Sequence, residues 1–168
     1  PMMVIIPRAV EELDIPVIAA GGIADARGFA AALALGADGV LMGTRFAATE
    51  ESPMHPNIKR RYTETGELDT VIIMSSIQNP LRCFRNRATE QVLQMEERKA
   101  PLGEILSIVG GKIGRKCYET GDAEGAAFPC SWGSALIKDI MPIQTVVDGI
   151  IEGAHTILEK LKSMEAVR

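Results

Sequence analysis

The sequence predicts an α/β fold, and the clearest support lies in residues 16–46, PVIAAGGIADARGFAAALALGADGVLMGTRF. Two short apolar runs, Val17–Ala20 and Val40–Met42, flank a helical pattern, and glycine follows each run. Continuous apolar runs of this length are typical of parallel strands that are buried on both faces. In (β/α)8 barrels a phosphate site lies after strands seven and eight. We therefore interpret residues 1–50 as the last two strands of such a barrel.

The helices of this barrel segment can be placed from apolar spacing and end signals. Residues 3–13 are expected to form a helix that leads into the first strand. Asp25 is a candidate N-cap for the helix between the two strands, and Gly36 is suited to end that helix. Two strands cannot close a barrel, so we expect the remaining strands to come from an N-terminal half, in cis or as a separate chain.

Beyond Phe46 the sequence becomes charged and mostly helical, which predicts a small second domain over residues 51–135. The expected elements are a helix from Ser52 to Gly66, a strand over Thr70–Met74, helices over Arg82–Arg98 and Leu102–Glu119, and a loop over 120–134. In the last segment, 136–168, Pro142 opens a helix that returns to the barrel. Its apolar stripe is expected to pack against the barrel wall.

A site for a phosphate-bearing ligand is expected where the two strands end. Glycine lets the backbone turn sharply and approach a ligand without a Cβ in the way. Backbone N–H groups at the strand ends, with a helix N-terminus behind them, would donate to the phosphate. The alternative is a tight turn without a ligand. The predicted cofactor-binding residues are Ala20, Gly21, Gly22, Leu41, Met42, Gly43 and Thr44, with the Thr44 hydroxyl as an extra donor.

Several segments carry a resemblance to a known family. They are residues 16–46, TEESPMHPNIK (49–59), ELDTVIIMSS (67–76), NPLRCFRN (79–86) and SALIKDIMPIQTVVDGII (134–151). Together they resemble the C-terminal half of the nitronate monooxygenase (2-nitropropane dioxygenase) family, which includes the FMN-dependent enoyl-acyl-carrier-protein reductases. The first segment is also similar to other phosphate-site barrels, such as the inosine monophosphate dehydrogenases.

The resemblance implies an FMN-dependent oxidoreductase. It would oxidise a small-molecule substrate, an alkyl nitronate, with O2, or reduce an enoyl thioester with NADH or NADPH. Most methionines are expected to fill gaps in the core, and Met42, next to Gly43, is a candidate contact for the flavin ring. The family's catalytic histidine, in a Gly-Gly-His motif, belongs to the N-terminal half, so neither His55 nor His155 inherits that role. A homo-oligomer is expected. The alternatives are a purine-nucleotide enzyme of the inosine monophosphate dehydrogenase kind and a non-catalytic subunit that binds a phosphorylated ligand or a partner chain.

Two positions depart from the family pattern. Leu41 stands where glutamine is common, which removes one polar contact to the cofactor. Trp132, in Cys130-Ser131-Trp132-Gly133, stands where the family tends to carry Gly-Gln near the flavin. We place Trp132 in the substrate pocket. The alternative is that its indole anchors the second domain to the barrel.

Composition excludes several classes of protein. A net charge of −4 and 4% aromatic residues give no support for nucleic-acid binding. No apolar run approaches the ~20 residues of a membrane span. The three widely spaced cysteines fit reduced thiols in the cytoplasm better than a disulfide framework or a metal site. A local group of basic residues is either a solvated face or a guide for an acidic carrier protein or a nicotinamide cofactor. Its members are Lys59, Arg60, Arg61, Arg82, Arg85 and Arg87.

Overall fold

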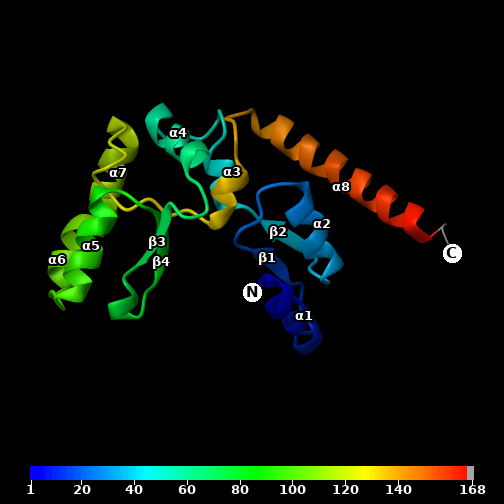
Figure 1. Ribbon diagram of the computed structural model, residues 1–168, viewed down its shortest axis with the longest axis horizontal. Coiled ribbons are helices and arrows are strands. Elements are labelled where there is room, and N and C mark those ends of the chain that lie inside the picture. The colour runs from blue at the N-terminus through cyan, green and yellow to red at the C-terminus, as the bar shows by residue number, and fades with distance from the viewer. Residues whose placement is uncertain (166–168) are drawn as a thin grey trace.

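Two separate two-stranded sheets organise the chain, and helices surround each of them (Figure 1). The structure is a computed structural model and describes residues 1–165. β1 (Ile18–Ala20) and β2 (Gly39–Leu41) pair in parallel, whereas β3 (Thr70–Ile73) and β4 (Leu81–Phe84) pair antiparallel. The helices are α1 Met2–Glu12, α2 Ala26–Ala34, α3 Gly43–Ala47, α4 Pro56–Glu64, α5 Arg87–Glu97, α6 Leu102–Val109, α7 Gly111–Thr120 and α8 Ile143–Glu165, with 3-10 turns η1 at Ser75–Ile77 and η2 at Trp132–Leu136.

The order α1, β1, α2, β2 confirms the prediction for the first segment. The Asp25 carboxylate accepts hydrogen bonds from the backbone N–H groups of Arg27 and Gly28, at 2.9 and 3.1 Å, and so caps α2. Gly36 follows α2 with a φ of +97°, and a Cβ there would lie 3.1 Å from the Val10 side chain. Only glycine combines this backbone conformation with such close packing of α1.

The expectation that both strands are buried on both faces is wrong for the described residues. Ile18 is 56% exposed and Leu41 is 59% exposed. The parallel sheet has only two strands within residues 1–165, so one face and both edges lack neighbours and no barrel closes. The opposite face packs on a small core made of Ile6, Ala19, Ile23, Ala32 and Ala37.

The helix predicted over Arg82–Arg98 begins five residues later than expected, because residues 81–84 form β4. The Asn86 side chain accepts from the Thr89 N–H and the Thr89 hydroxyl accepts from the Asn86 N–H, both at 2.9 Å. This capping box fixes the start of α5 and leaves the preceding residues free to pair with β3. The second lobe is therefore a hairpin covered by helices rather than helices around one strand.

The helix predicted over Leu102–Glu119 is interrupted. Gly110 has extended dihedrals, φ −60° and ψ 139°, and is both the C-cap of α6 and the N-cap of α7. A Cβ on Gly110 would lie 2.7 Å from the carbonyl oxygen of Leu106. Two consecutive glycines weaken a helix and allow this break. The structure therefore has two short helices in place of one.

Both α4 and α8 begin next to a residue that can start a helix. The helix expected from Ser52 begins at Pro56 instead, because His55 is the N-cap of this helix. The Nδ1 atom of His55 accepts a hydrogen bond from the Asn57 N–H at 3.2 Å. The last helix begins at Ile143, directly after Pro142 as predicted. Within residues 1–165 no helix combines the length and the apolar character that crossing a membrane requires.

The last helix, α8, packs on the barrel segment only in its first half. Its buried side chains are Val146, Ile150 and Ala154, and they face α2. The backbones of α8 and α2 approach so closely that a Cβ on Gly153 would lie 2.5 Å from the Ala26 Cβ. The helix then runs past α2 and away from the rest of the molecule (Figure 1). Its later apolar residues, Leu158 and Leu161, are exposed.

Candidate functional site

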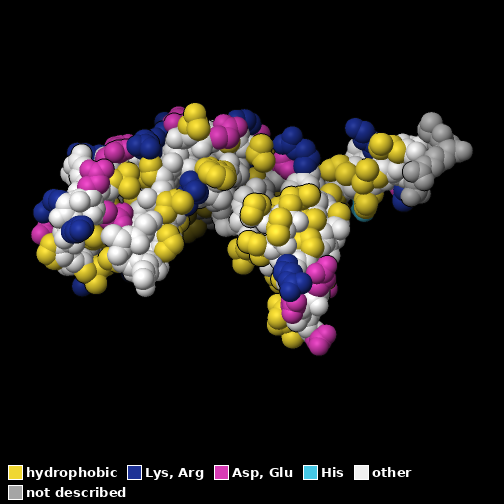
Figure 2. Space-filling view, turned by 60° about the horizontal axis from the view of Figure 1, so that its bottom comes forward, with side chains coloured by type: hydrophobic (Ala, Val, Ile, Leu, Met, Phe, Trp, Pro, Cys, Tyr) yellow, Lys and Arg dark blue, Asp and Glu magenta, His cyan; other side chains and the backbone are white. Residues whose placement is uncertain are grey.

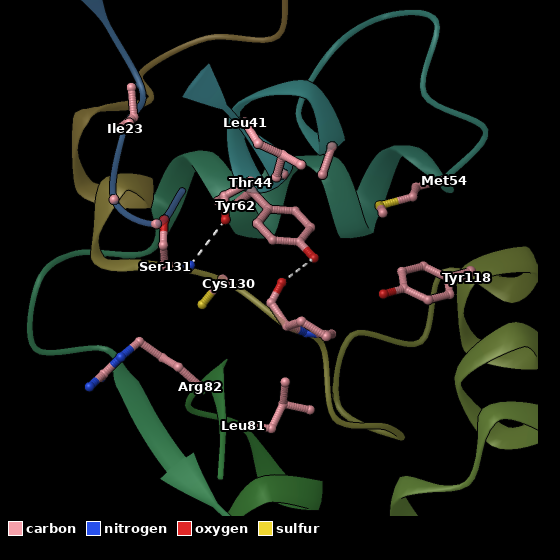
Figure 3. A pocket seen from close by; sticks show the side chains of 15 residues that line it. Ile23, Leu41, Thr44, Met54, Tyr62, Leu81, Arg82, Tyr118, Cys130 and Ser131 are labelled. Carbon is pink, nitrogen blue, oxygen red and sulfur yellow. Dashed lines mark hydrogen bonds between the residues drawn. The ribbon is translucent and has the colours of Figure 1, made fainter. Parts of the chain in front are cut away.

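A cavity of about 490 Å³ lies at the carboxyl ends of β1 and β2, where the barrel segment meets the second lobe (Figure 3). One wall comes from the ends of the two parallel strands, and the other from α4, β4, α7 and the segment before η2. The residues that line it are Gly21, Gly22, Ile23, Leu41, Gly43, Thr44, Ala47, Met54, Tyr62, Leu81, Arg82, Tyr118, Pro129, Cys130 and Ser131. Five of the seven residues predicted to bind a cofactor are in this set. Ala20 and Met42 are not, and Met42 packs against the core beneath β1.

The turn after β1 has the geometry expected of a glycine cradle. Gly21 and Gly22 have φ values of +99° and +76°, which side chains with a Cβ rarely adopt. A Cβ built at Gly21, Gly22 or Gly43 would meet no atom within 4 Å, so open space lies in front of the backbone at both strand ends. The two turns therefore present backbone toward the same cavity.

The helix N-terminus at this site belongs to α3 rather than to α2. In α2, two N–H groups of the first turn already donate to Asp25. The sequence predicts a strand over Val40–Met42 that is followed by glycine, and in the structure a short helix, α3, begins at that glycine, Gly43. The first N–H groups of a helix have no partner within it. Those of Gly43 and Thr44, two residues that line the cavity, are therefore candidate donors to a ligand there.

The segment before η2 is fixed against both strand ends. The Ser131 N–H donates to the Thr44 hydroxyl at 3.0 Å. At Gly133 a Cβ would lie 2.8 Å from the carbonyl oxygen of Gly22, so only glycine fits against the cradle there. No local sequence pattern indicates this contact, because Gly22 and Gly133 are 111 residues apart. Ser131 thus forms part of the cavity wall, and the turn over residues 131–133 is held against the cradle.

Two tyrosines on the far wall were not anticipated. The Tyr62 hydroxyl donates to the carbonyl oxygen of Pro129 at 2.9 Å. Burial raises the pKa of Tyr62 far above its usual range, and burial also raises the pKa of Tyr118. Both are therefore neutral hydrogen-bonding groups at physiological pH rather than phenolates. Nothing in the sequence pattern distinguished them, since each is a single aromatic residue on an amphipathic helix.

The cysteines are free and buried. Burial raises the pKa of the Cys130 thiol to about 12. Burial, with a smaller contribution from Cys130, also raises the pKa of Cys83 to about 12. Since the thiolate is the nucleophilic form, neither has the properties of a reactive cysteine. In the part of the chain that the structure describes, no group of three or more His, Cys, Asp or Glu side chains is arranged to hold a metal ion.

Trp132 lies beside the cavity rather than in its wall. It is 60% exposed, and the guanidinium of Arg82 stacks on its ring, with Cζ 4.3 Å from the ring centroid. Within residues 1–165 the indole is therefore not buried between the two lobes. Its predicted place in the substrate pocket and the alternative role as an anchor both stay predictions. Arg82 itself lines the cavity.

The predicted basic surface does not form as one patch. Lys59 is buried, and its Nζ donates to the carbonyl oxygen of Glu50 at 2.7 Å. Arg61 donates to the carbonyl oxygen of Arg85 at 2.9 Å, and Arg85 is paired with Glu90. Charges adjacent in the sequence point to different parts of the fold, so only Arg82 of this group lines the cavity.

Comparison with known proteins places the chain in a family. A family model described as nitronate monooxygenase matches residues 1–153. The chain belongs to the nitronate monooxygenase family. A probable nitronate monooxygenase of Staphylococcus aureus (strain MSSA476) is 32% identical over 155 residues, which are 92% of this chain and 43% of that protein.

Two other relatives extend the comparison. FabK from Thermotoga maritima superposes with a TM-score of 0.90 at 34% identity, covering 97% of this chain and 51% of FabK. A (3aS,4S,5R,7aS)-5-hydroxy-7a-methyl-1-oxo-octahydro-1H-indene-4-carboxyl-CoA dehydrogenase of Rhodococcus jostii (strain RHA1) is 50% identical over 68 residues, 40% of this chain and 19% of the relative. The chain spans about half the length of FabK and less of the other two. It is thus a mixed α/β structure that aligns to part of a nitronate monooxygenase or FabK barrel.

Proposed function

We propose that this chain is the cofactor-phosphate half of an FMN-dependent oxidoreductase. The observation that carries the proposal is the convergence of two glycine strand ends, one βα unit apart, on a single cavity. Membership of the nitronate monooxygenase family supports it. In this proposal the other half of the barrel, in cis or as a separate chain, supplies the remaining strands and the catalytic base.

The residues at the strand ends fit a phosphate monoester. Gly21, Gly22 and Gly43 leave open space in front of the backbone, and α3 begins at Gly43, beside that space. N–H groups at a helix start suit an anion because they are unpartnered donors at the positive end of the helix dipole. The Thr44 hydroxyl accepts from Ser131, so its own hydrogen is available for the phosphate. The bare glycine turn remains the alternative that an experiment must exclude.

The other cavity residues would position the flavin ring and exclude water. The ring would lie against apolar side chains such as Ile23, Leu41 and Met54, while Tyr62 and Tyr118 offer neutral hydroxyl groups (Figure 3). When bound, FMN supplies the electron transfer with substrate, and the protein orients the ring and tunes its electronics. Leu41 offers no polar contact where family members commonly have glutamine.

The first candidate reaction is oxidation of an alkyl nitronate with O2, which the printed names of the staphylococcal relatives suggest. The second is an oxidation or reduction of an acyl thioester. One observation favours this second candidate, the 50% identity over 68 residues to a dehydrogenase named for a CoA thioester.

An absorbance spectrum of the purified complete protein tests the proposal. Flavin bands, and release of FMN on denaturation, are the expected result. A bound purine nucleotide instead would favour the inosine monophosphate dehydrogenase alternative. A colourless protein that binds a phosphorylated ligand would favour the non-catalytic subunit. Consumption of O2 with a nitronate, against oxidation of NADPH with an enoyl thioester, then separates the two candidate reactions.

A further inference from the structure

The single tryptophan of the chain is exposed beside the cavity. Trp132 is 60% exposed, whereas tryptophan is highly buried on average. The Arg82 guanidinium stacks on its ring, with Cζ 4.3 Å from the ring centroid. Much of the indole remains open to solvent, so a second planar group has room to stack there.

Arg82 is held in place and its charge is not neutralised. One of its terminal nitrogens, Nη1, donates to the Thr70 hydroxyl at 2.8 Å, and its carbonyl oxygen accepts from the Cys130 N–H at 3.0 Å. Within residues 1–165 it forms no ion pair with a carboxylate. In Figure 3 its stem borders the cavity while the guanidinium points away from the cavity centre. A cation is therefore held at the rim, next to an aromatic ring.

The backbone that carries Trp132 is equally well defined. The Ser131 hydroxyl accepts from the Gly133 N–H at 3.2 Å, and the Ser131 N–H donates to Thr44 at 3.0 Å. Gly133 packs on the carbonyl oxygen of Gly22. The indole is thus presented from a turn that is tied to the proposed phosphate cradle.

We propose that Trp132 and Arg82 bind the adenosine diphosphate part of a ligand whose reactive end enters the cavity. A purine would stack on the open part of the indole, since bases stack on exposed aromatic side chains. The planar guanidinium would bind the diphosphate through two or more N–H donors. Two ligand classes share this chemistry: coenzyme A thioesters and reduced nicotinamide dinucleotides. The position of the reactive end rests on the flavin site proposed above, whereas recognition of adenosine diphosphate does not.

Titration calorimetry of the complete flavoprotein with adenosine diphosphate tests the inference directly. Trp132→Gln and Arg82→Ala are each expected to weaken binding roughly tenfold, the size of a single stacking or charge-assisted contact. Trp132→Phe keeps a ring for stacking and is expected to lose less affinity for adenosine diphosphate than Trp132→Gln. Arg82→Lys keeps the charge but not the planar fork, so its affinity is expected to lie between those of the unmodified protein and Arg82→Ala. Arg60→Ala is the matched control, because Arg60 is an exposed arginine that does not line the cavity.

Two pairs of larger ligands identify the source of the adenosine diphosphate. If the variants weaken coenzyme A but not pantetheine, the ligand is a coenzyme A thioester. If they weaken NADPH but not reduced nicotinamide mononucleotide, the ligand is a nicotinamide dinucleotide. The proposal is overturned if the unmodified protein does not bind adenosine diphosphate, or if the Trp132 and Arg82 variants bind it as well as Arg60→Ala does. Flavin absorbance of the same samples reports on the proposed function separately, because the calorimetric result does not depend on it.

Discussion

At the residue scale, close backbone contacts determine the shape of the site. The contact between Gly133 and the carbonyl oxygen of Gly22 joins residues that are far apart in the sequence. Sequence reasoning recognised Gly21, Gly22 and Gly43 because a glycine after an apolar strand is a local signal. It could not recognise Gly133, whose requirement depends on which turn lies opposite in the folded chain.

Replacing Gly133 by alanine is expected to disturb the cradle. The new Cβ would lie 2.8 Å from the Gly22 oxygen, so the turn must move, at a cost of about 1–3 kcal/mol in stability. The complete protein should also retain less FMN after purification, measured as flavin absorbance per protein. The control is Gly149→Ala inside α8, where the new Cβ would meet no atom within 4 Å. This substitution should stabilise the protein by about 0.5–1 kcal/mol, because alanine favours a helix over glycine. Equal flavin content in both variants would contradict the role of the Gly133 contact.

The loss of the Thr44 hydroxyl should weaken flavin binding modestly. Thr44→Val removes one donor to the phosphate and also the acceptor of the Ser131 N–H. A loss of about 1–3 kcal/mol in FMN affinity is expected. Gly43→Val should be more severe, because its branched side chain fills the space through which the backbone approaches the phosphate. Equilibrium dialysis with free FMN measures the FMN affinity of the Thr44→Val and Gly43→Val variants. Stoichiometric FMN in Gly43→Val would refute the phosphate assignment.

The buried thiols predict how stability depends on pH. Burial raises the pKa of Cys83 and Cys130 to about 12, well above the value of about 9 for a thiol in the unfolded chain. The unfolded chain releases these protons first, so stability is fully present below pH 9 and falls between pH 9 and about 12. The limiting slope is about 1.4 kcal/mol per pH unit for each thiol. Urea denaturation of the complete protein at pH 8 and 10 should show this loss, and the Cys83→Ala, Cys130→Ala double variant should show a smaller one.

At the element scale, the sequence located most helices and strands but not all of their ends. The parallel pair and the cap at Asp25 follow from local signals, and the structure confirms them. β4 was mistaken for the first turn of a helix because Leu81–Phe84 has no turn residue in its interior. Its assignment depends on pairing with β3 and on the capping box at Asn86. The short helix α3 was missed because five residues leave no periodic pattern.

The break between α6 and α7 gives a matched pair of substitutions. Gly110→Ala should destabilise by about 1–3 kcal/mol, because its Cβ would lie 2.7 Å from the Leu106 oxygen. Gly111→Ala should cause no loss, since its Cβ meets nothing within 4 Å and alanine favours the helix that begins there. Thermal denaturation of the two variants distinguishes this geometry from a continuous helix. In a continuous helix both alanines would stabilise.

At the scale of the whole molecule, apolar surface gathers on the barrel segment. The exposed side chains include Met3, Val4 and Ile5 of α1, Ile18 of β1 and Leu41 of β2. Figure 2 shows apolar side chains concentrated over the central part of the molecule, where Figure 1 places the parallel sheet. A large apolar patch beside an open parallel strand is typical of a surface that another chain or segment covers. The proposed division into segments 1–50, 51–135 and 136–168 and the expected homo-oligomer stay predictions.

This surface predicts that the 168-residue chain by itself neither stays monomeric nor binds FMN with submicromolar affinity. Ile18→Lys should increase the monomeric fraction of the isolated chain, because a charge on an exposed strand opposes edge-to-edge association. The same substitution should lower flavin retention in the complete protein, where Ile18 would be covered by barrel strands. The control is Leu68→Lys, since Leu68 is 89% exposed and lies just before β3 in the other lobe. Sedimentation velocity and FMN titration of the isolated chain, with flavin absorbance of the complete protein, measure these effects. If Ile18→Lys and Leu68→Lys behave alike in both settings, the open face of β1 is not where the barrel is completed.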